Sequence, residues 1–409
     1  MNPLDWSGYP EQLARARART GGQESVSWAL RADAVVITFD FRFLGGSVGT
    51  ATGDVIEEAF TTARNAGLPV VSMITTGGSR MQEGMHSLRQ LQRIARQCHL
   101  HAAAGLPHVS VLGDPTTGGL WASLGASADV VLAVPGAQVG FAGSRVRPTD
   151  DPVYTSEGQY AAGTVDLVVR QGEVAATVSA YLGLLTGGSA EPADVPRALG
   201  ALDLPADGWS AVARARAARR PRAQAYLDDH FDARLPISGD RAGGVDPGML
   251  CGLGRRGDRV VAYAAQTGTA TAPAGFRTAS RLIRLADRFG LPVLTLVDTP
   301  GAANDAAAER AGVGAAIAEL FGAVAAARVP ITTLVIGEGG SGGALALASP
   351  DRLWITPDAY FSVIAPELAT AILKRDPATA PATADQLRLR PQDLLAMGIV
   401  QGIAAAQSS

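Results

Sequence analysis

Two stretches of this sequence read almost alike: AGLPVVSMITTGG at residues 66–78 and FGLPVLTLVDTPG at residues 289–301. Each places a Gly-Leu-Pro turn before a continuous apolar run and ends in a glycine-containing loop. A short apolar run with turn residues on both sides is typical of a buried strand in a parallel sheet. Gly78 and Gly301 occupy the same place in the two stretches, so we infer that one architecture occurs twice in the chain.

A second pair of similar segments lies further along each half. DPTTGGLWASLGASADVVLAVPGAQVGF occupies residues 114–141, and GEGGSGGALALASPDRLWITPDAYFSVI occupies residues 337–364. Each contains a Gly-Gly pair that opens an Ala-rich helix, followed by an aspartate, an apolar strand, a proline turn and another strand. Elsewhere, apolar runs such as AVVITF alternate with helical patterns such as GDVIEEAFTTARNAG. This alternation predicts βαβ units, and hence a layered α/β domain with a mostly parallel sheet in each half.

The chain of 409 residues is too long for a single hydrophobic core. Its composition changes over residues 187–249, where Gly, Pro, Ala and Asp are frequent and an arginine-rich helical pattern follows. We therefore expect a first α/β domain over residues 1–190, a linker and helical connection over 191–235, and a second α/β domain over 236–409.

Charge and cysteine content argue against several classes of protein. The 35 basic and 38 acidic residues give a net charge of −3, which lacks the positive field of a nonspecific nucleic-acid binder. Cys98 and Cys251 alone cannot form a four-cysteine zinc site or a disulfide framework. We see neither a signal-peptide pattern nor an apolar run of transmembrane length. We expect a cytoplasmic protein with no metal, no nucleic-acid partner and no membrane segment.

The glycine pairs that follow the buried strands are candidate oxyanion holes. A glycine loop between a strand and a helix lets a ligand approach unpaired backbone N–H groups, and the helix dipole favours negative charge there. Each such donor can contribute about 3 kcal/mol of transition-state stabilisation. Tight strand-to-helix packing would also require glycine, but two equivalent copies favour function. We predict catalytic roles for Gly118 and Gly119 and, as the equivalent pair, Gly342 and Gly343, with Gly77, Gly78 and Gly301 shaping the two holes.

Three familiar motifs are present only in part. Residues 252–257 have the spacing GxGxxG, but a strand pattern follows them, whereas a dinucleotide fingerprint opens a helix. Ser341 lies in a GxSxG pattern, yet all five histidines precede it, and hydrolases with this elbow place the histidine after the serine. Lys374 follows no GxxxxG, so no phosphate-binding P-loop is present. The glycine pairs therefore remain the strongest candidate site.

Longer strings in both halves resemble one known family, the carboxyltransferase component of biotin-dependent acyl-CoA carboxylases. Residues from about 38 to 185 look like the bacterial acetyl-CoA carboxylase β subunit, and residues from about 209 to 404 look like the α subunit. The resemblance implies two tandem crotonase-like domains, fused in one chain. It rests on DFRFLGGSVGTATG (40–53), TTGGSRMQEG (75–84), DPTTGG (114–119) and PGAQVGFAGSRV (135–146), and on SGDRA (238–242), GLPVLTLVDTPGA (290–302), GEGGSGGALAL (337–347), FSVIAPE (361–367) and PQDLLAMGIV (391–400).

The resemblance also implies a reaction. Carboxybiotin, supplied on a separate carrier protein, releases its carboxyl group, and the ureido anion removes an α-proton from an acyl thioester such as acetyl-CoA. The resulting enolate captures the carbon dioxide. By this resemblance the hole near Gly118 and Gly119 serves the enolate, the hole near Gly342 and Gly343 serves the biotin carbonyl, and Arg310 holds the transferred carboxylate.

Other positions are assigned by the same resemblance or depart from it. Arg80 is a candidate substrate-binding residue, and we expect Glu83 to brace its loop. The sequence starts downstream of the zinc ribbon with which the β subunit normally begins, so we expect no zinc. The α subunit's basic insertion is absent after Gln266, which leaves coenzyme A recognition open, and Leu368 replaces the glycine of the family's Pro-Glu-Gly.

No Met-Lys-Met biotinylation site occurs in the chain. The implied partners are therefore a biotin carboxyl carrier protein and a biotin carboxylase, with acyl-CoA or an acyl carrier protein presenting the substrate. In the family each active site lies where a β-type half faces an α-type half, commonly of a neighbouring protomer, so we expect a homodimer or higher homo-oligomer. The fused, trimmed form favours a specialised biosynthetic pathway. Two alternatives stay open: a biotin-independent malonyl-thioester decarboxylase, and a non-catalytic scaffold that binds acyl carriers.

Overall fold

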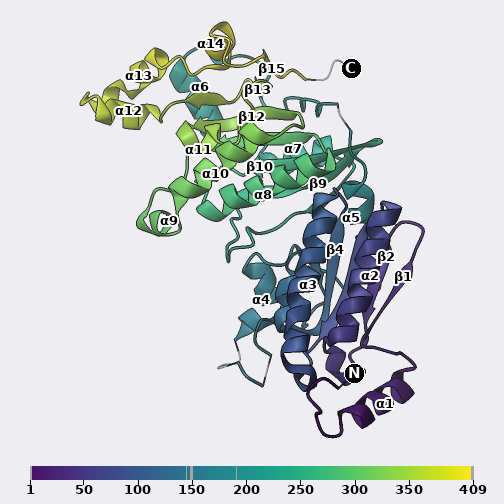
Figure 1. Cartoon of the computed structure of the whole chain (residues 1–409). Helices are drawn as coiled ribbons and strands as arrows, with labels where there is room; N and C mark the ends of the chain where they lie inside the picture. The colour runs from purple at the N-terminus through teal and green to yellow at the C-terminus, as the bar shows by residue number, and fades with distance from the viewer. Residues whose placement is uncertain (1, 144, 148–150, 190, 407–409) are drawn as a thin grey trace. The chain divides into compact units, whose positions relative to one another are not determined.

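The computed structural model describes residues 2–143, 145–147, 151–189 and 191–406 (Figure 1). Within these ranges, no helix is both long enough and apolar enough to cross a lipid bilayer. The chain forms two compact units. Unit 1 comprises Met1–Thr186 with Arg241–Gly243, and unit 2 comprises Gly187–Asp240 with Gly244–Ser409.

The segment 191–235, which we expected to be a separate linker, is instead part of unit 2. The reason is hydrophobic burial. Tyr226 and Leu227 of its helix α7 (Ala223–His230) are buried in one core cluster with Leu294 and Leu334 of the unit 2 sheet. Burying an apolar side chain of this size stabilises the fold by about 1.5–3 kcal/mol, so the segment is held firmly in unit 2.

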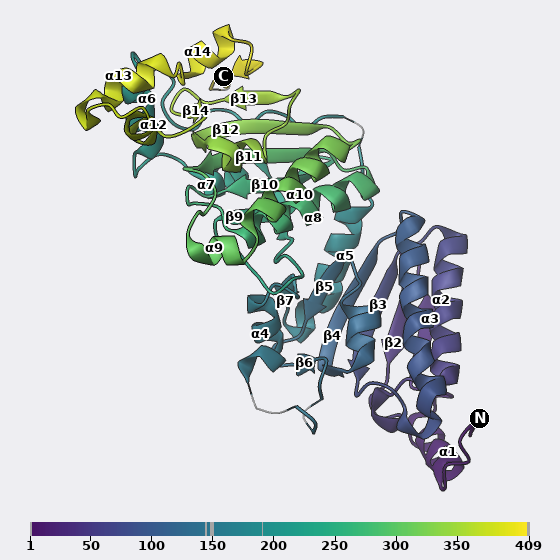
Figure 2. The ribbon, with the colours of Figure 1, turned by 60° about the vertical axis from the view of Figure 1, so that its left-hand side comes forward.

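Unit 1 is a layered α/β domain. In its described part, seven strands form one sheet in the order β1-β2-β3-β4-β5-β7, with β6 paired to β4. Among these described strands, only the β1–β2 pair is antiparallel. Helices α2 and α3 lie side by side (Figure 2). The strands are β1 (Val26–Leu30), β2 (Val35–Phe39), β3 (Val70–Thr76), β4 (His108–Thr117), β5 (Val130–Ala133), β6 (Val139–Gly140) and β7 (Leu167–Val168), and the helices are α1 (Tyr9–Thr20), α2 (Thr50–Ala66), α3 (Gly84–Ala103), α4 (Ser156–Ala161) and α5 (Val174–Leu185).

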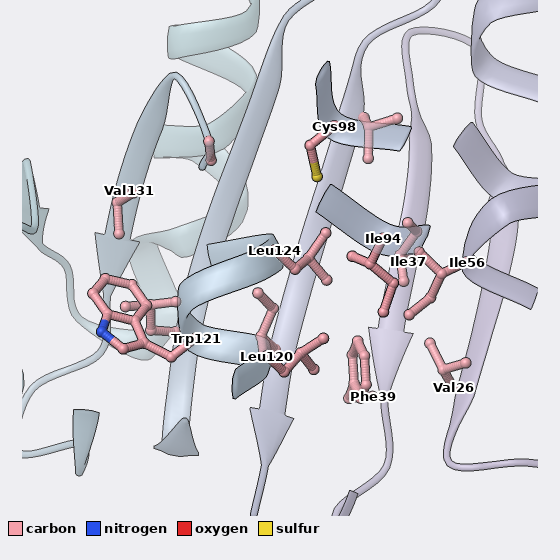
Figure 3. Close-up of a cluster of buried hydrophobic side chains, with 14 of the residues drawn as sticks. Val26, Ile37, Phe39, Ile56, Ile94, Cys98, Leu120, Trp121, Leu124 and Val131 are labelled. Atoms are coloured by element: carbon pink, nitrogen blue, oxygen red, sulfur yellow. The ribbon is translucent and has the colours of Figure 1, made fainter. Parts of the chain in front are cut away.

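The core of unit 1 fixes the helical turn that follows Gly118 and Gly119. Leu120 precedes a π-helical turn, η3 (Trp121–Gly125), and is fully buried. Figure 3 shows Leu120 and Leu124 in one cluster with Ile94 and Cys98 of α3. Because the side chain of Leu120 is anchored there, the backbone directly after Gly119 has a fixed position.

Unit 2 repeats this architecture. In its described part, the strand order is β15-β13-β12-β11-β10-β9-β8, with β14 paired to β12. The β8–β9 and β9–β10 pairs are antiparallel and the others are parallel. Its strands are β8 (Ala233–Pro236), β9 (Met249–Arg256), β10 (Arg259–Gln266), β11 (Val293–Thr299), β12 (Ile331–Gly340), β13 (Leu353–Ile355), β14 (Tyr360–Ser362) and β15 (Gly402–Ile403), and its helices are α6 (Gly208–Arg216), α7 (Ala223–His230), α8 (Pro273–Phe289), α9 (Ala306–Arg310), α10 (Val313–Ala326), α11 (Ser341–Leu345), α12 (Pro366–Ile372), α13 (Ala380–Gln386) and α14 (Pro391–Ala396).

The repeated Gly-Leu-Pro turn ends a helix and starts a strand in both units. Gly67 follows α2 and Gly290 follows α8, each with a φ of +66° and each donating its N–H to the last helical carbonyls. Glycine suits this left-handed position because it has no Cβ to clash. The proline then leads into the buried parallel strand, as the sequence predicted.

Both sheets share an irregularity at the ends of their two central strands. In unit 1, Ile74 pairs with Leu112 but Thr76 pairs with Thr116, so three residues of β4 stand opposite one residue of β3. In unit 2, β12 and β11 show the same shift between Val297 and Thr299, at the equivalent positions of the repeat. The internal repeat therefore extends to the strand register, and each shift lies directly before a glycine loop.

The GxGxxG string proves to be a hairpin. Residues 252–256 belong to β9, Gly257 has a φ of +57° in the turn, and β10 begins at Arg259 and runs antiparallel to β9. No helix opens there, in agreement with our exclusion of a dinucleotide site.

His230, the last residue of α7, is 3 % exposed and titrates abnormally. Burial and the positive charge of Arg256 lower the pKa of His230 to about 4. Its Nδ1 lies 2.6 Å from Nη1 of Arg256, and its Nε2 is buried with no partner in the described structure. Because arginine only donates, Nδ1 accepts and the neutral ring is the form that fits.

We predict that acid destabilises unit 2 through this histidine. The unfolded ring binds a proton near pH 6.5 and the folded ring only near pH 4, so stability is full above pH 6.5 and falls as the pH drops to 4. The free energy of unfolding falls by roughly 3 kcal/mol over this pH range. Urea denaturation of the wild type and of His230→Asn, which keeps an acceptor near the Nδ1 position, measures it. An unchanged acid dependence in this variant would refute the assignment, and His86→Asn outside the core is the control.

Candidate active site

The glycine loop of unit 1 lies at the carboxyl ends of β3 and β4. Three of its four predicted glycines use their N–H groups inside the unit. Gly77 donates to Gly45 O (2.8 Å), Gly78 to Thr76 Oγ1 (3.0 Å) and Gly118 to Gly140 O (3.1 Å). Only Gly119, at the start of the following helical turn, has an N–H without an acceptor among the described residues.

The corresponding loop of unit 2 connects β12 to α11. Gly301, on the preceding loop, donates its N–H to Thr299 Oγ1 (3.1 Å). Gly342 and Gly343 lie in the first turn of α11, and the described residues provide no acceptor for their N–H groups. Such first-turn N–H groups have no partner within a helix. No described backbone or side-chain acceptor therefore competes with a ligand oxygen for these N–H groups.

The structure corrects our pairing of the two glycine pairs by one residue. The register shifts of the two units end at Thr76 and Thr299, which are equivalent residues of the repeat. The same offset in sequence number aligns Gly118 with Ser341 and Gly119 with Gly342. Gly118 and Ser341 both have a positive φ, +80° and +55°, because each is the turn between strand and helix. The equivalent donors are consequently Gly119 with Leu120 in unit 1, and Gly342 with Gly343 in unit 2.

The sequence pattern did not indicate Leu120 as a candidate, because the prediction rested on glycines. A backbone donor does not depend on its side chain, and that of Leu120 points into the core (Figure 3). The described residues offer no acceptor for its N–H. Applying the spacing between Gly78 and Gly301 to Gly343 would have identified it.

Arg80 lies close to the unit 1 loop but is not free to bind a substrate. Its side chain is 1 % exposed and forms ion pairs with Glu24 and Glu83. It also donates to Tyr9 Oη (3.3 Å) and to Ser47 O (2.7 Å). A direct substrate contact would require this network to open, so the geometry instead gives Arg80 a positioning role.

Glu83 braces the loop as expected. It accepts hydrogen bonds from the N–H of Thr50 (2.7 Å) and from Tyr9 Oη (2.5 Å). Burial opposes its ionisation, but these bonds and the charge of Arg80 outweigh burial and lower the pKa of Glu83. Burial and the neighbouring carboxylate raise the pKa of Tyr9 to about 12, so its hydroxyl stays protonated as the donor.

Arg310 is exposed at the end of α9. Its guanidinium forms no ion pair or hydrogen bond with any residue in the described part of the chain. The same residues contain no group of three or more His, Cys, Asp or Glu side chains placed to hold a metal ion. The chemistry that this geometry offers is hydrogen bonding from backbone N–H groups.

Comparisons with known proteins assign both halves of the chain. Residues 32–180 match the family described as "Carboxyl transferase domain", and residues 205–407 match the family described as "Acetyl co-enzyme A carboxylase carboxyltransferase-like". The acetyl-coenzyme A carboxylase carboxyl transferase subunits beta/alpha of Saccharopolyspora erythraea are 40 % identical over 97 % of this chain and 74 % of the relative. A probable biotin-dependent acyl-coenzyme A carboxylase beta3 subunit of Mycobacterium bovis is 33 % identical over 97 % of this chain and 82 % of the relative.

The chain belongs to the acetyl-CoA carboxylase carboxyltransferase family. The family resemblance, the fused β-like and α-like halves and the assignment as a carboxyltransferase enzyme are thereby confirmed. Among solved structures, transcarboxylase 12S superposes with a TM-score of 0.76 at 21 % identity, covering 91 % of this chain and 76 % of that one. This agrees with the predicted fold of two crotonase-like α/β domains.

The space around each glycine distinguishes packing from ligand access in this carboxyltransferase. A Cβ on Gly118 would lie 2.9 Å from the Cα of Gly78, and one on Gly343 would overlap the backbone of Gly301 and Ala302. A Cβ on Gly342 would meet nothing within 4 Å. Gly343 is therefore required by packing, whereas Gly342 faces open space.

We predict opposite effects on stability for the two neighbouring glycines. Gly343→Ala forces backbone atoms apart and should lower the free energy of unfolding by about 1–3 kcal/mol. Gly342→Ala should change it by less than about 0.5 kcal/mol. Urea denaturation of both variants measures the difference, and equal effects would show that the space around α11 is not as described.

Arg80→Met should destabilise unit 1 strongly, because Glu24 and Glu83 would stay buried without their counter-charge. The expected loss is about 3–5 kcal/mol of unfolding free energy. Arg42→Met is the matched control: its ion pair with Asp40 is exposed and should contribute at most about 1 kcal/mol. A loss for Arg80→Met no larger than that of the control would contradict the positioning role.

Proposed function

We propose that this carboxyltransferase moves the carboxyl group of carboxybiotin, carried on a separate protein, to the α-carbon of a short acyl thioester such as acetyl-CoA. The observation that carries the proposal is the pair of equivalent turns whose N–H groups lack acceptors among the described residues: Gly119 with Leu120, and Gly342 with Gly343. Two donor sets suit a reaction in which two different oxygens become negative. The names of the relatives from S. erythraea and M. bovis support acetyl-CoA or acyl-CoA and biotin dependence.

The two turns act on the negative charge that develops during transfer. Carboxybiotin, as the incoming substrate, supplies the carbon dioxide and, once this has left, a ureido anion that accepts the α-proton. We assign Gly119 and Leu120 to the thioester oxygen, whose charge grows as the C–H bond breaks, and Gly342 and Gly343 to the ureido oxygen. Fixed N–H donors need no reorganisation as charge develops, and each contributes about 3 kcal/mol.

Arg310 remains our candidate for the transferred carboxylate, since its exposed guanidinium has no ion partner in the described part of unit 2. The enzyme would require a biotin carboxyl carrier protein and a biotin carboxylase as partners, and no metal. We also propose a homodimer or higher homo-oligomer, consistent with the hexamer named for transcarboxylase 12S.

Turnover separates this proposal from its alternatives. The purified chain is given a carboxybiotinylated carrier and a panel of short acyl-CoAs, and mass spectrometry measures the carboxylated thioesters. Decarboxylation of malonyl-CoA by the chain alone, without biotin or biocytin, would instead identify a decarboxylase. Binding of the carrier without turnover of any thioester would identify a scaffold.

Gly342→Ala tests the role of the open face directly. We expect kcat to fall by about 10²-fold, because the methyl group occupies the space through which a substrate oxygen approaches the donors. Gly322→Ala is the matched control, since a Cβ on Gly322 of α10 also meets nothing within 4 Å. Turnover of Gly342→Ala at the wild-type rate would reject the assignment of this turn.

A further inference from the structure

The register shift in unit 2 leaves backbone groups of β12 that the strand ladder cannot satisfy. Asp298 is the single residue of β11 that stands opposite residues 336–338 of β12. Its Oδ1 accepts the N–H of Glu338 at 3.2 Å. A side-chain carboxylate thus replaces a ladder carbonyl near the carboxyl end of β12, which ends at Gly340.

A buried arginine completes this replacement. Arg220 is 3 % exposed and forms an ion pair with Asp298, which is fully buried. It also donates to Ile336 O (3.2 Å) and to Ala215 O, which ties β12 to the end of α6. A Cβ on Gly337 would overlap both Arg220 and Asp298, so the pair fills the space next to the strand.

Glu338 is also held through its side chain. Its carboxylate accepts from Nε of Arg216 (2.8 Å) and from Tyr360 Oη (2.8 Å). Arg216 reaches further to Glu367 of α12. Burial and the carboxylate of Glu338 raise the pKa of Tyr360, so this hydroxyl remains a donor. Glu338 lies among the last residues of β12, which ends at Gly340, and α11 begins at Ser341. Both the backbone and the side chain of Glu338 are therefore held by groups outside the β11–β12 ladder.

Unit 1 satisfies its own register shift differently. There Oγ1 of Thr116, a residue of the strand itself, lies 2.9 Å from both Ile74 O and Gly113 O, and its single hydrogen is directed toward these two carbonyls. Unit 2 instead uses an arginine from the segment between α6 and α7. The register shift of unit 2 is thus held by a residue that lies outside its two strands and far from them in the sequence.

We infer that Arg220 and Asp298 are positioning residues of the carboxyltransferase reaction. They hold the last residues of β12, and so set the direction in which the chain enters α11 at Ser341 and the orientation of the Gly342 and Gly343 N–H groups. The inference rests on the proposed function. Arginine is needed because its planar fork can reach a carboxylate and a carbonyl together, which a lysine ammonium cannot do in the same geometry.

The test uses Arg220→Met and Arg220→Lys in the full chain, with Arg259→Met as the matched control. Arg259 also binds a carboxylate (Asp194, 3.0 Å) and a backbone carbonyl (Glu191 O, 3.2 Å), but at the opposite end of the strands, where β10 begins. We expect both Arg220 variants to lose at least tenfold in kcat while KM for the acyl-CoA stays within about twofold. The Arg259 variant should keep kcat.

Hydrogen exchange gives a readout that does not depend on turnover. Peptides covering residues 334–347 should exchange their amide hydrogens at least tenfold faster in Arg220→Lys than in the wild type. In Arg259→Met, the exchange rates of these peptides should equal those of the wild type. Asp298→Asn keeps an acceptor for the N–H of Glu338, so its exchange rates over residues 334–347 should lie between those of the wild type and Arg220→Lys. If Arg220→Met does not fold, Asp298→Asn and Arg220→Lys provide the test.

The possible failures are distinguishable. A wild-type chain without biotin-dependent turnover rejects the proposed function, and the exchange measurement then still decides whether Arg220 holds the loop. An active wild type whose Arg220 variants keep both kcat and the exchange rates of residues 334–347 overturns the positioning inference alone. A rise in KM with kcat unchanged also overturns it, because that pattern indicates lost substrate binding.

Discussion

The structure depends on one constraint: a parallel strand pair must open at its carboxyl end without leaving backbone groups unpaired. Both units open their central pair at the same register, where three residues of one strand stand opposite one residue of the other. Buried N–H and C=O groups without partners cost about 1–3 kcal/mol each. Side chains must replace the ladder there, and the choice of those side chains determines how each glycine loop is held.

Buried charge is the second feature that the units share. Arg80 in unit 1 and Arg220 in unit 2 are both almost inaccessible and paired with carboxylates. The desolvation of a buried ion pair largely cancels its attraction, so such a pair is poor evidence of added stability. Such a pair instead fixes the relative positions of the groups that it bonds, because the planar guanidinium of an arginine can bond several groups only in one arrangement. We interpret both clusters as devices that fix a loop rather than as sources of stability.

The catalytic groups that we propose are backbone N–H groups, and this explains what the sequence could indicate. Glycine marks the places where the chain turns with a positive φ or where another backbone lies close, as at Gly118 and Gly343. It does not mark the donors, one of which is the amide of Leu120. The spacing of the repeat was visible in the sequence and already aligns Gly118 with Ser341, but the two Gly-Gly pairs suggested another alignment, which the strand register corrects.

The sequence by itself determined the repeat, the α/β class of both halves, the family and the location of the glycine loops, because these follow from local patterns: apolar runs, turn residues and long shared strings. The tertiary structure decided which N–H groups have no acceptor among the described residues, that residues 191–235 belong to unit 2, and that Arg80 and Arg220 are buried in ion pairs. These outcomes depend on contacts between residues as far apart as Arg80 and Tyr9, or Arg220 and Asp298. No local pattern encodes such contacts, since they form only when the sheet brings the segments together.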